Sequence, residues 1–161
     1  MNRRTTLMSI ALLSLVACAC PQASFAQSSP LMGSWKLDLA KSKYTAGSAP
    51  RSQTITYGQD GQNFKATTQS VNAQGNATTT VFLHIYDGQA HPTTGSPVFD
   101  ASTYLRVNGN TIIFSRSKAG KLVSTGTNVL SPDGKTMTVT TTGILDANGL
   151  AGTNIGVYDK Q

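Results

Sequence analysis

The residues whose types and spacing come nearest to a metal site are His84, Asp87 and His91. Two imidazoles and a carboxylate are ligands that zinc accepts. However, His84 falls in an apolar stretch typical of a strand, and Asp87 begins the turn signal Asp87-Gly88. His91 follows that bend, so no single rigid element holds the three side chains. Structural roles are therefore the favoured interpretation, and we expect no metal and no other cofactor.

The patterns that mark common enzyme sites are missing from the sequence. There is no Gly-x-Ser-x-Gly elbow, no phosphate-binding loop and no dinucleotide fingerprint. All seven acidic residues are Asp, and most fall in turn signals. A pair of carboxylates placed for glycosidase-type catalysis is therefore not expected. An enzyme would require a cluster such as His84 and an Asp with Arg106 in one cavity. We therefore predict no catalytic residues and no enzyme activity.

Binding of a small molecule is the function that the remaining side chains favour. Aromatic residues at candidate inward positions, with one arginine, form the predicted ligand-binding set: Phe64, Phe82, Tyr86, Tyr104, Arg106 and Phe114. The same strands are rich in Thr and Ser, which would give an interior lined partly by hydroxyl groups. Such an interior suits an amphipathic molecule better than a bare alkyl chain. Trp35 is predicted to be a core residue at one end of the domain, with Gly33 as its structural neighbour.

Strands are the elements expected to position these residues. β-branched residues dominate after residue 30, and turn signals such as Asp60-Gly61 and Asp133-Gly134 recur at short intervals. About nine strands are predicted, at 33–37, 53–58, 63–71, 78–86, 103–108, 111–117, 122–130, 136–143 and 153–158. Antiparallel strands in this order indicate an up-and-down barrel or a sandwich. One helical turn is expected at 40–44, and the irregular segments 40–51 and 87–101 are candidates for the mouth of a cavity.

The first 26 residues have the order of a secretory signal peptide. Arg3 and Arg4 precede an apolar run, and Ser24-Phe25-Ala26 offers small residues for a cut after Ala26. We therefore predict a signal peptide at 1–26, one domain at 27–161, and a periplasmic or secreted location. An alternative stays open, because Leu15-Val16-Ala17-Cys18 resembles a lipobox whose use would leave a lipoprotein tethered to a membrane through acylated Cys18.

Removal of the leader also fixes the chemistry of the mature chain. Both cysteines, Cys18 and Cys20, lie in the leader, so the mature chain has no thiol and no disulfide. Loss of Arg3 and Arg4 lowers the formal net charge from +6 to +4. The basic residues are scattered, so nucleic acid is not an expected partner.

Three blocks of sequence carry a resemblance to a known group of proteins. Met32-Gly33-Ser34-Trp35-Lys36-Leu37 looks like the Gly-x-Trp opening of lipocalins and fatty-acid-binding proteins. With the middle block around Tyr86-Asp87-Gly88 and the late block beginning at Asp133-Gly134-Lys135, the chain resembles small exported bacterial lipocalin-like proteins of undefined function. The resemblance implies an all-β, antiparallel, up-and-down lipocalin-like or fatty-acid-binding-protein-like barrel of about 8–10 strands.

The resemblance also implies a function and one departure from the superfamily pattern. The expected function is binding of a small apolar or amphipathic molecule inside a monomeric barrel of the cell envelope. The alternative is a filled barrel that serves as a structural or interaction module without catalysis. The superfamily places an Arg on the Trp from a late strand, where this chain reads Asn154-Ile155-Gly156-Val157. Arg106, Arg116 and Lys160 are the candidates to replace that cation.

Overall fold

The protein folds into one closed antiparallel β-barrel in a computed structural model that describes residues 29–145 and 151–161. The predicted signal peptide at 1–26, with Cys18, lies outside the described residues. The strands are β1 (Gly33–Tyr44), β2 (Ser52–Asp60), β3 (Asn63–Val71), β4 (Ala77–His84), β5 (Ala90–Thr94), β6 (Ala101–Arg106), β7 (Thr111–Lys118), β8 (Lys121–Leu130), β9 (Thr136–Leu145) and β10 (Ala151–Lys160).

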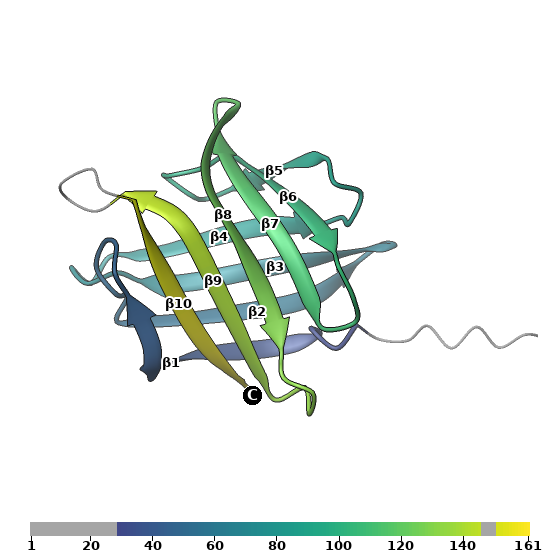
Figure 1. Ribbon diagram of the computed structural model, residues 1–161, viewed down its shortest axis with the longest axis horizontal. Coiled ribbons are helices and arrows are strands. Elements are labelled where there is room, and N and C mark those ends of the chain that lie inside the picture. Colours follow the sequence, from purple (N-terminus) through teal and green to yellow (C-terminus); the bar gives the residue numbers. More distant parts are fainter. Residues whose placement is uncertain (1–28, 146–150) are drawn as a thin grey trace, which may run out of the picture.

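Strand order in the barrel follows the sequence, as expected for up-and-down topology. Each strand pairs with the next, and β10 returns to pair with β1, so that the sheet closes (Figure 1). The closing register places Trp35 opposite Lys160 and Leu37 opposite Tyr158. These observations confirm the predicted all-β barrel, and the architecture is consistent with a lipocalin or calycin fold. In the part of the chain described, no helix is long and apolar enough to cross a membrane.

Two expectations about the irregular segments are wrong. Residues 40–44 do not form a helical turn, because β1 continues through them to Tyr44 after a shift in register between Asp38 and Lys43. The segment 87–101 contains a tenth strand, β5, even though it includes Pro92. Only two residue pairs join β5 to β4, so this short strand tolerates a residue that cannot donate a backbone hydrogen bond.

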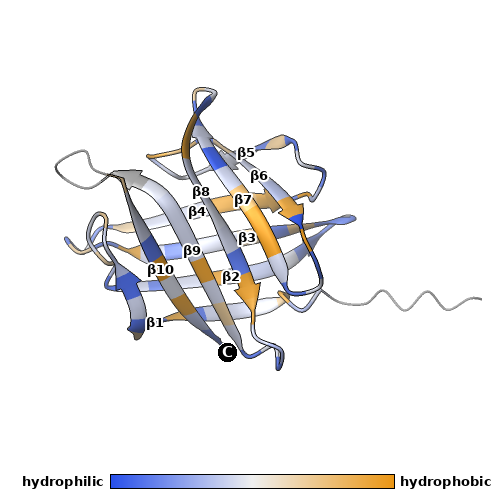
Figure 2. Cartoon of the chain, viewed as in Figure 1, coloured by the Kyte–Doolittle hydropathy of each residue, from blue (hydrophilic) through white to orange (hydrophobic). Residues whose placement is uncertain are grey.

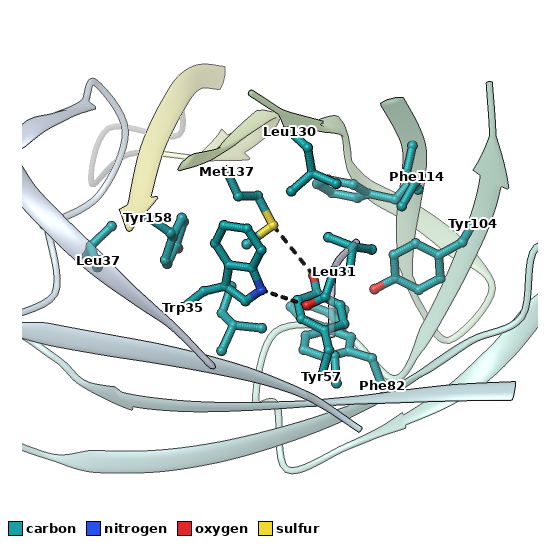
Figure 3. Close-up of a cluster of buried hydrophobic side chains, with 14 residues drawn as sticks. Leu31, Trp35, Leu37, Tyr57, Phe82, Tyr104, Phe114, Leu130, Met137 and Tyr158 are labelled. Carbon is teal, nitrogen blue, oxygen red and sulfur yellow. Dashed lines mark hydrogen bonds between the residues drawn. The ribbon is translucent and has the colours of Figure 1, made fainter. Parts of the chain in front are cut away.

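One end of the barrel is closed by apolar side chains. Trp35 and Met137 are fully buried there, with Leu31, Tyr57 and Leu130 packed around them (Figure 3). The start of β7 and the end of β8 also carry hydrophobic residues at this end (Figure 2). Because the strands alternate in direction, the connections at 45–51, 72–76, 95–100 and 119–120 gather at the opposite, open end.

Gly33 connects the segment that contains Leu31 to the start of β1. Its φ is +107°, a conformation that side chains with a Cβ rarely adopt. The residues just before it include Leu31, whose carbonyl accepts a hydrogen bond of 2.7 Å from the Trp35 Nε1–H. This local turn explains why Gly and Trp occur together at the start of the barrel.

Candidate functional site

A cavity of about 280 Å³ lies inside the open half of the barrel. Its polar wall includes Thr68, Thr80 and Thr141, together with Gln53, whose side-chain oxygen accepts a hydrogen bond from the Tyr158 hydroxyl. Burial raises the pKa of Tyr158, so its phenol stays neutral and remains a donor. The apolar wall includes Ile55, Phe82, Phe99 and Val139. The site is therefore lined by hydroxyl groups and by apolar side chains together.

The β5–β6 connection at 95–100 forms one lip of the cavity. Phe99 folds inward and its ring stacks on that of Phe82, with 5.8 Å between ring centres. Gly95 fixes the start of this lip, because its φ is +80° and an added Cβ would overlap the carbonyl oxygen of Thr79. Val98 remains exposed at the rim. The sequence prediction that part of 87–101 borders a mouth is thus met by its second half only.

A side recess of about 480 Å³ opens beside this lip. Val98 and Phe99 line one side of it, and Leu122 and Val123 of β8 line the other. Leu122 is 66 % exposed, so it adds apolar surface at the rim of the recess. The recess therefore offers an apolar surface next to the main cavity.

Arg116 of β7 connects these spaces. Its side chain lines the main cavity, the side recess and a third, deeper space. The guanidinium carbon lies 4.6 Å from the ring centre of Phe114, 4.8 Å from that of Phe99 and 5.5 Å from that of Phe82. Such contacts are cation–π interactions, and they hold the charged group among aromatic rings inside the barrel.

The deeper space is a void of about 30 Å³ with an unusual polar lining. His84 Nδ1, Asn128 Oδ1 and Arg116 Nε are buried and have no hydrogen-bond partner among the described residues. The His84 ring stacks on the Tyr104 ring, with 3.9 Å between ring centres. The Tyr57 ring contacts it edge-on, with 5.1 Å between ring centres. Burial, with smaller effects from Arg116 and Arg106, lowers the pKa of His84 to about 3, so its imidazole is neutral at physiological pH. The void is large enough for a water molecule but not for an organic ligand.

Only half of the predicted ligand-binding residues border these spaces. Phe82 lines both the main cavity and the deep void, and Tyr104 and Phe114 line the deep void. Phe64, Tyr86 and Arg106 lie toward the closed end and border neither space.

The three residues outside the cavity have other contacts. Arg106 stacks over the Tyr86 ring at 4.5 Å, and Phe64 is half-buried at the start of β3, opposite His84. All three lie at or next to a strand end on the side of the barrel away from the mouth. Residue type alone does not reveal this position along the barrel axis.

Sequence reasoning missed Arg116 as a cavity residue. The alternation along β7 contained the signal, because Ile112, Phe114 and Arg116 fall on one face of the strand. A charged residue that follows two inward-facing apolar residues on the same strand face indicates either the end of the barrel or a polar site inside it. The structure shows the second case.

Of the three basic residues considered as a cation over Trp35, Lys160 is the one that lies there. Its ammonium nitrogen lies 5.2 Å from the centre of the Trp35 ring and donates a hydrogen bond of 3.1 Å to the Pro30 carbonyl. Arg106 and Arg116, the other two candidates, contact different rings. The replacement follows from the register in which Trp35 and Lys160 are directly opposite.

The three residues considered for a metal site are not brought together. His91 Nε2 lies 3.0 Å from both carboxylate oxygens of Asp87, which are exposed in the connection between β4 and β5. The Gln89 backbone N–H and then His91 lower the pKa of that carboxyl group. His84 is instead buried inside the barrel. The described residues contain no group of three His, Cys, Asp or Glu side chains that could hold a metal ion.

Comparison with known proteins adds no family assignment. A scan against protein-family models finds no match, and no curated protein matches the chain.

Proposed function

We propose that the protein is a non-catalytic binding protein that takes up one small amphipathic molecule inside its barrel. The observation that carries this proposal is the cavity at the open end, about 280 Å³ in volume, which is lined by hydroxyl groups and aromatic rings together. Binding sites of small molecules are concave, largely apolar, and carry a few polar groups that orient the ligand. A cavity of this size suits a small ligand.

Two sequence features support a place for this function in the cell envelope. The leader at 1–26 has the order of an export signal, and the mature chain lacks cysteine. The three sequence blocks that resemble small exported bacterial lipocalin-like proteins fall on the barrel, and the opening block includes the Trp35 plug. On this proposal the protein is a periplasmic or secreted carrier or sensor, or a membrane-tethered one if Cys18 is acylated.

A second candidate function has one observation in its favour. Leu105 and Ile113 are neighbours on the outside of β6 and β7, and they are 44 % and 41 % exposed. They border an outer groove of about 490 Å³ with threonines of β8 and β9. An apolar outer face could dock a partner protein, with the barrel serving as a scaffold.

Native mass spectrometry of the protein purified from its own host distinguishes the two functions. The binding proposal expects a co-purifying small molecule that leaves on denaturation. Purification of a stoichiometric partner protein, with an empty barrel that takes up no amphipathic molecule, would favour the scaffold instead. The intact mass of the same sample reports whether the chain begins at Gln27 or at acylated Cys18.

A further inference from the structure

We propose that the bound molecule is an acid, and that Arg116 binds its carboxylate or phosphate group inside the barrel. This inference deepens the proposed function and rests on it. It assigns the ligand an orientation, with the anionic group at Arg116 and the apolar part along the side recess toward Val98 and Leu122.

The first argument is the absence of a counter-ion for Arg116. No carboxylate of the described residues lies within 4.0 Å of its guanidinium group. The acids that form ion pairs in the described structure do so elsewhere: Asp38 and Asp159 with Lys41, Asp87 with His91, and Asp100 with Lys118. A guanidinium remains charged in any protein environment, so the interior carries a positive charge that no carboxylate of the described residues pairs with.

The second argument is hydrogen bonding. The Nε atom of Arg116 is buried and has no acceptor among the described residues. The three phenylalanine rings around the group offer only their faces, which stabilise a cation but accept no conventional hydrogen bond from it. A carboxylate or phosphate fits the planar fork of an arginine, and such charge-assisted hydrogen bonds are roughly twice as strong as neutral ones.

The third argument is the shape of the surrounding space. Below Arg116 lies only the void of about 30 Å³, which excludes an alkyl or aryl group. Beside it, the recess of about 480 Å³ is bordered by Phe99, Leu122 and Val123. Above it, the main cavity is bordered by Thr80 and Thr141 as well as by Phe82. A small acid can therefore place its charge on Arg116 only with its apolar part directed away from the closed end.

Isothermal titration calorimetry at low ionic strength tests the proposal with four probes of equal chain length: octanoate, octyl phosphate, octanol and octylamine. We expect one or both anions to bind at least tenfold more tightly than octanol, and octylamine to bind more weakly than octanol. The relative affinity of octanoate and octyl phosphate then identifies the acidic group. Equal affinity for octanol and both anions would overturn the assignment of an acid but leave the binding function standing. Failure of all four probes to bind would overturn both.

Substitution of Arg116 locates the effect. Arg116→Gln is expected to reduce anion affinity at least tenfold and to change octanol affinity less than twofold. Arg106→Gln is the matched control, because it removes an arginine at the closed end that borders none of the interior spaces, and it should change neither affinity. An unchanged preference for anions in Arg116→Gln would contradict the role of this residue.

A measurement on the unaltered protein covers the case in which Arg116→Gln fails to fold. The Nε–H signals of the three arginines in the mature chain can be followed by ¹⁵N-correlated NMR. Arg116→Lys, which keeps the charge, assigns the Arg116 signal by its loss. Saturation with the tighter anion should shift that signal, and octanol should not. A signal that ignores the anion would overturn the proposal.

Discussion

Trp35 ties three separate parts of the chain together at the closed end. Its ring is fully buried, its Nε1–H donates to the Leu31 carbonyl, and Lys160 lies over its face. The plug thus joins the segment before β1 to the end of β10, the strands that close the barrel (Figure 3). The same residue was predicted as core from its type and position.

Replacement of Trp35 should therefore weaken the whole barrel. Trp35→Phe leaves the buried Leu31 carbonyl without its donor and a cavity beside Met137, at a cost of about 3 kcal/mol in unfolding free energy. Urea denaturation followed by circular dichroism measures this loss. Lys160→Met, which keeps the aliphatic contact and removes the charge, should cost at most about 1 kcal/mol. A smaller loss for Trp35→Phe than for Lys160→Met would contradict this account.

His84 should make stability depend on pH in a window where no other described group is expected to act as strongly. Its pKa is lowered to about 3 in the folded protein by burial, with a reference value of 6.5. The unfolded chain therefore takes up a proton at pH values where the folded one does not, and stability falls as pH falls below 6.5. Between pH 6.5 and 4.5 the loss is roughly 2 kcal/mol.

Denaturation midpoints measured across this pH range provide the check. His84→Phe should remove most of the dependence, while His91→Gln, a change at the surface histidine, should preserve it. The lowered pKa values of Asp38, Asp87 and Asp133 add further acid sensitivity only near and below pH 4, where these carboxylates take up protons. A flat profile for the unaltered protein between pH 6.5 and 4.5 would show that His84 is not buried as a neutral group.

At the scale of the elements, side chains along β2 and β9 alternate between the two faces of the sheet, as an extended strand requires. Ile55 and Tyr57, like Met137, face inward as their spacing of two predicts. The errors fell where pairing overrides local preference. Residues 40–44 join β1 because Lys43 and Tyr44 pair with Ile155 and Asn154 of β10, partners more than 100 positions away.

Close packing between strands predicts an intolerant glycine in β8. A Cβ at Gly126 would overlap the Thr140 carbonyl oxygen of β9 and the Phe114 ring of β7. Gly126→Ala should therefore cost about 3 kcal/mol or more in unfolding free energy, because both neighbours must move. Gly58→Ala is the matched control within a strand, since nothing lies within 4 Å of its added Cβ. Equal midpoints of urea denaturation for the two variants would contradict the packing of β7, β8 and β9.

At the scale of the whole molecule, ring closure has a consequence for association. Each of the ten strands pairs on both sides, so ordinary edge-to-edge strand pairing between copies has no starting point. The remaining candidate surface is the outer groove beside Leu105 and Ile113. We accordingly predict that the mature protein is a monomer in solution.

Size-exclusion chromatography with light scattering measures the mass directly. The expected value is that of one mature chain across the accessible range of concentration. A dimer that persists in the unaltered protein and dissociates in Ile113→Thr would contradict the prediction and identify the outer groove as the interface. Thr103→Ser, a conservative change on the same groove, serves as the control.

The sequence alone determined the fold class and the end plug, and it places both cysteines within the predicted leader. Those properties follow from local information: β-branched composition, glycine-rich turns, side-chain alternation and residue counts. Which side chains border the cavity depended on tertiary structure. From the sequence, Tyr86 and Arg106 were as suitable for ligand binding as Phe82. The structure places them at the closed end, whereas Arg116 lines the cavity. The physical reason is that position along the barrel axis depends on strand direction, register and bulges, which pairing between distant segments sets.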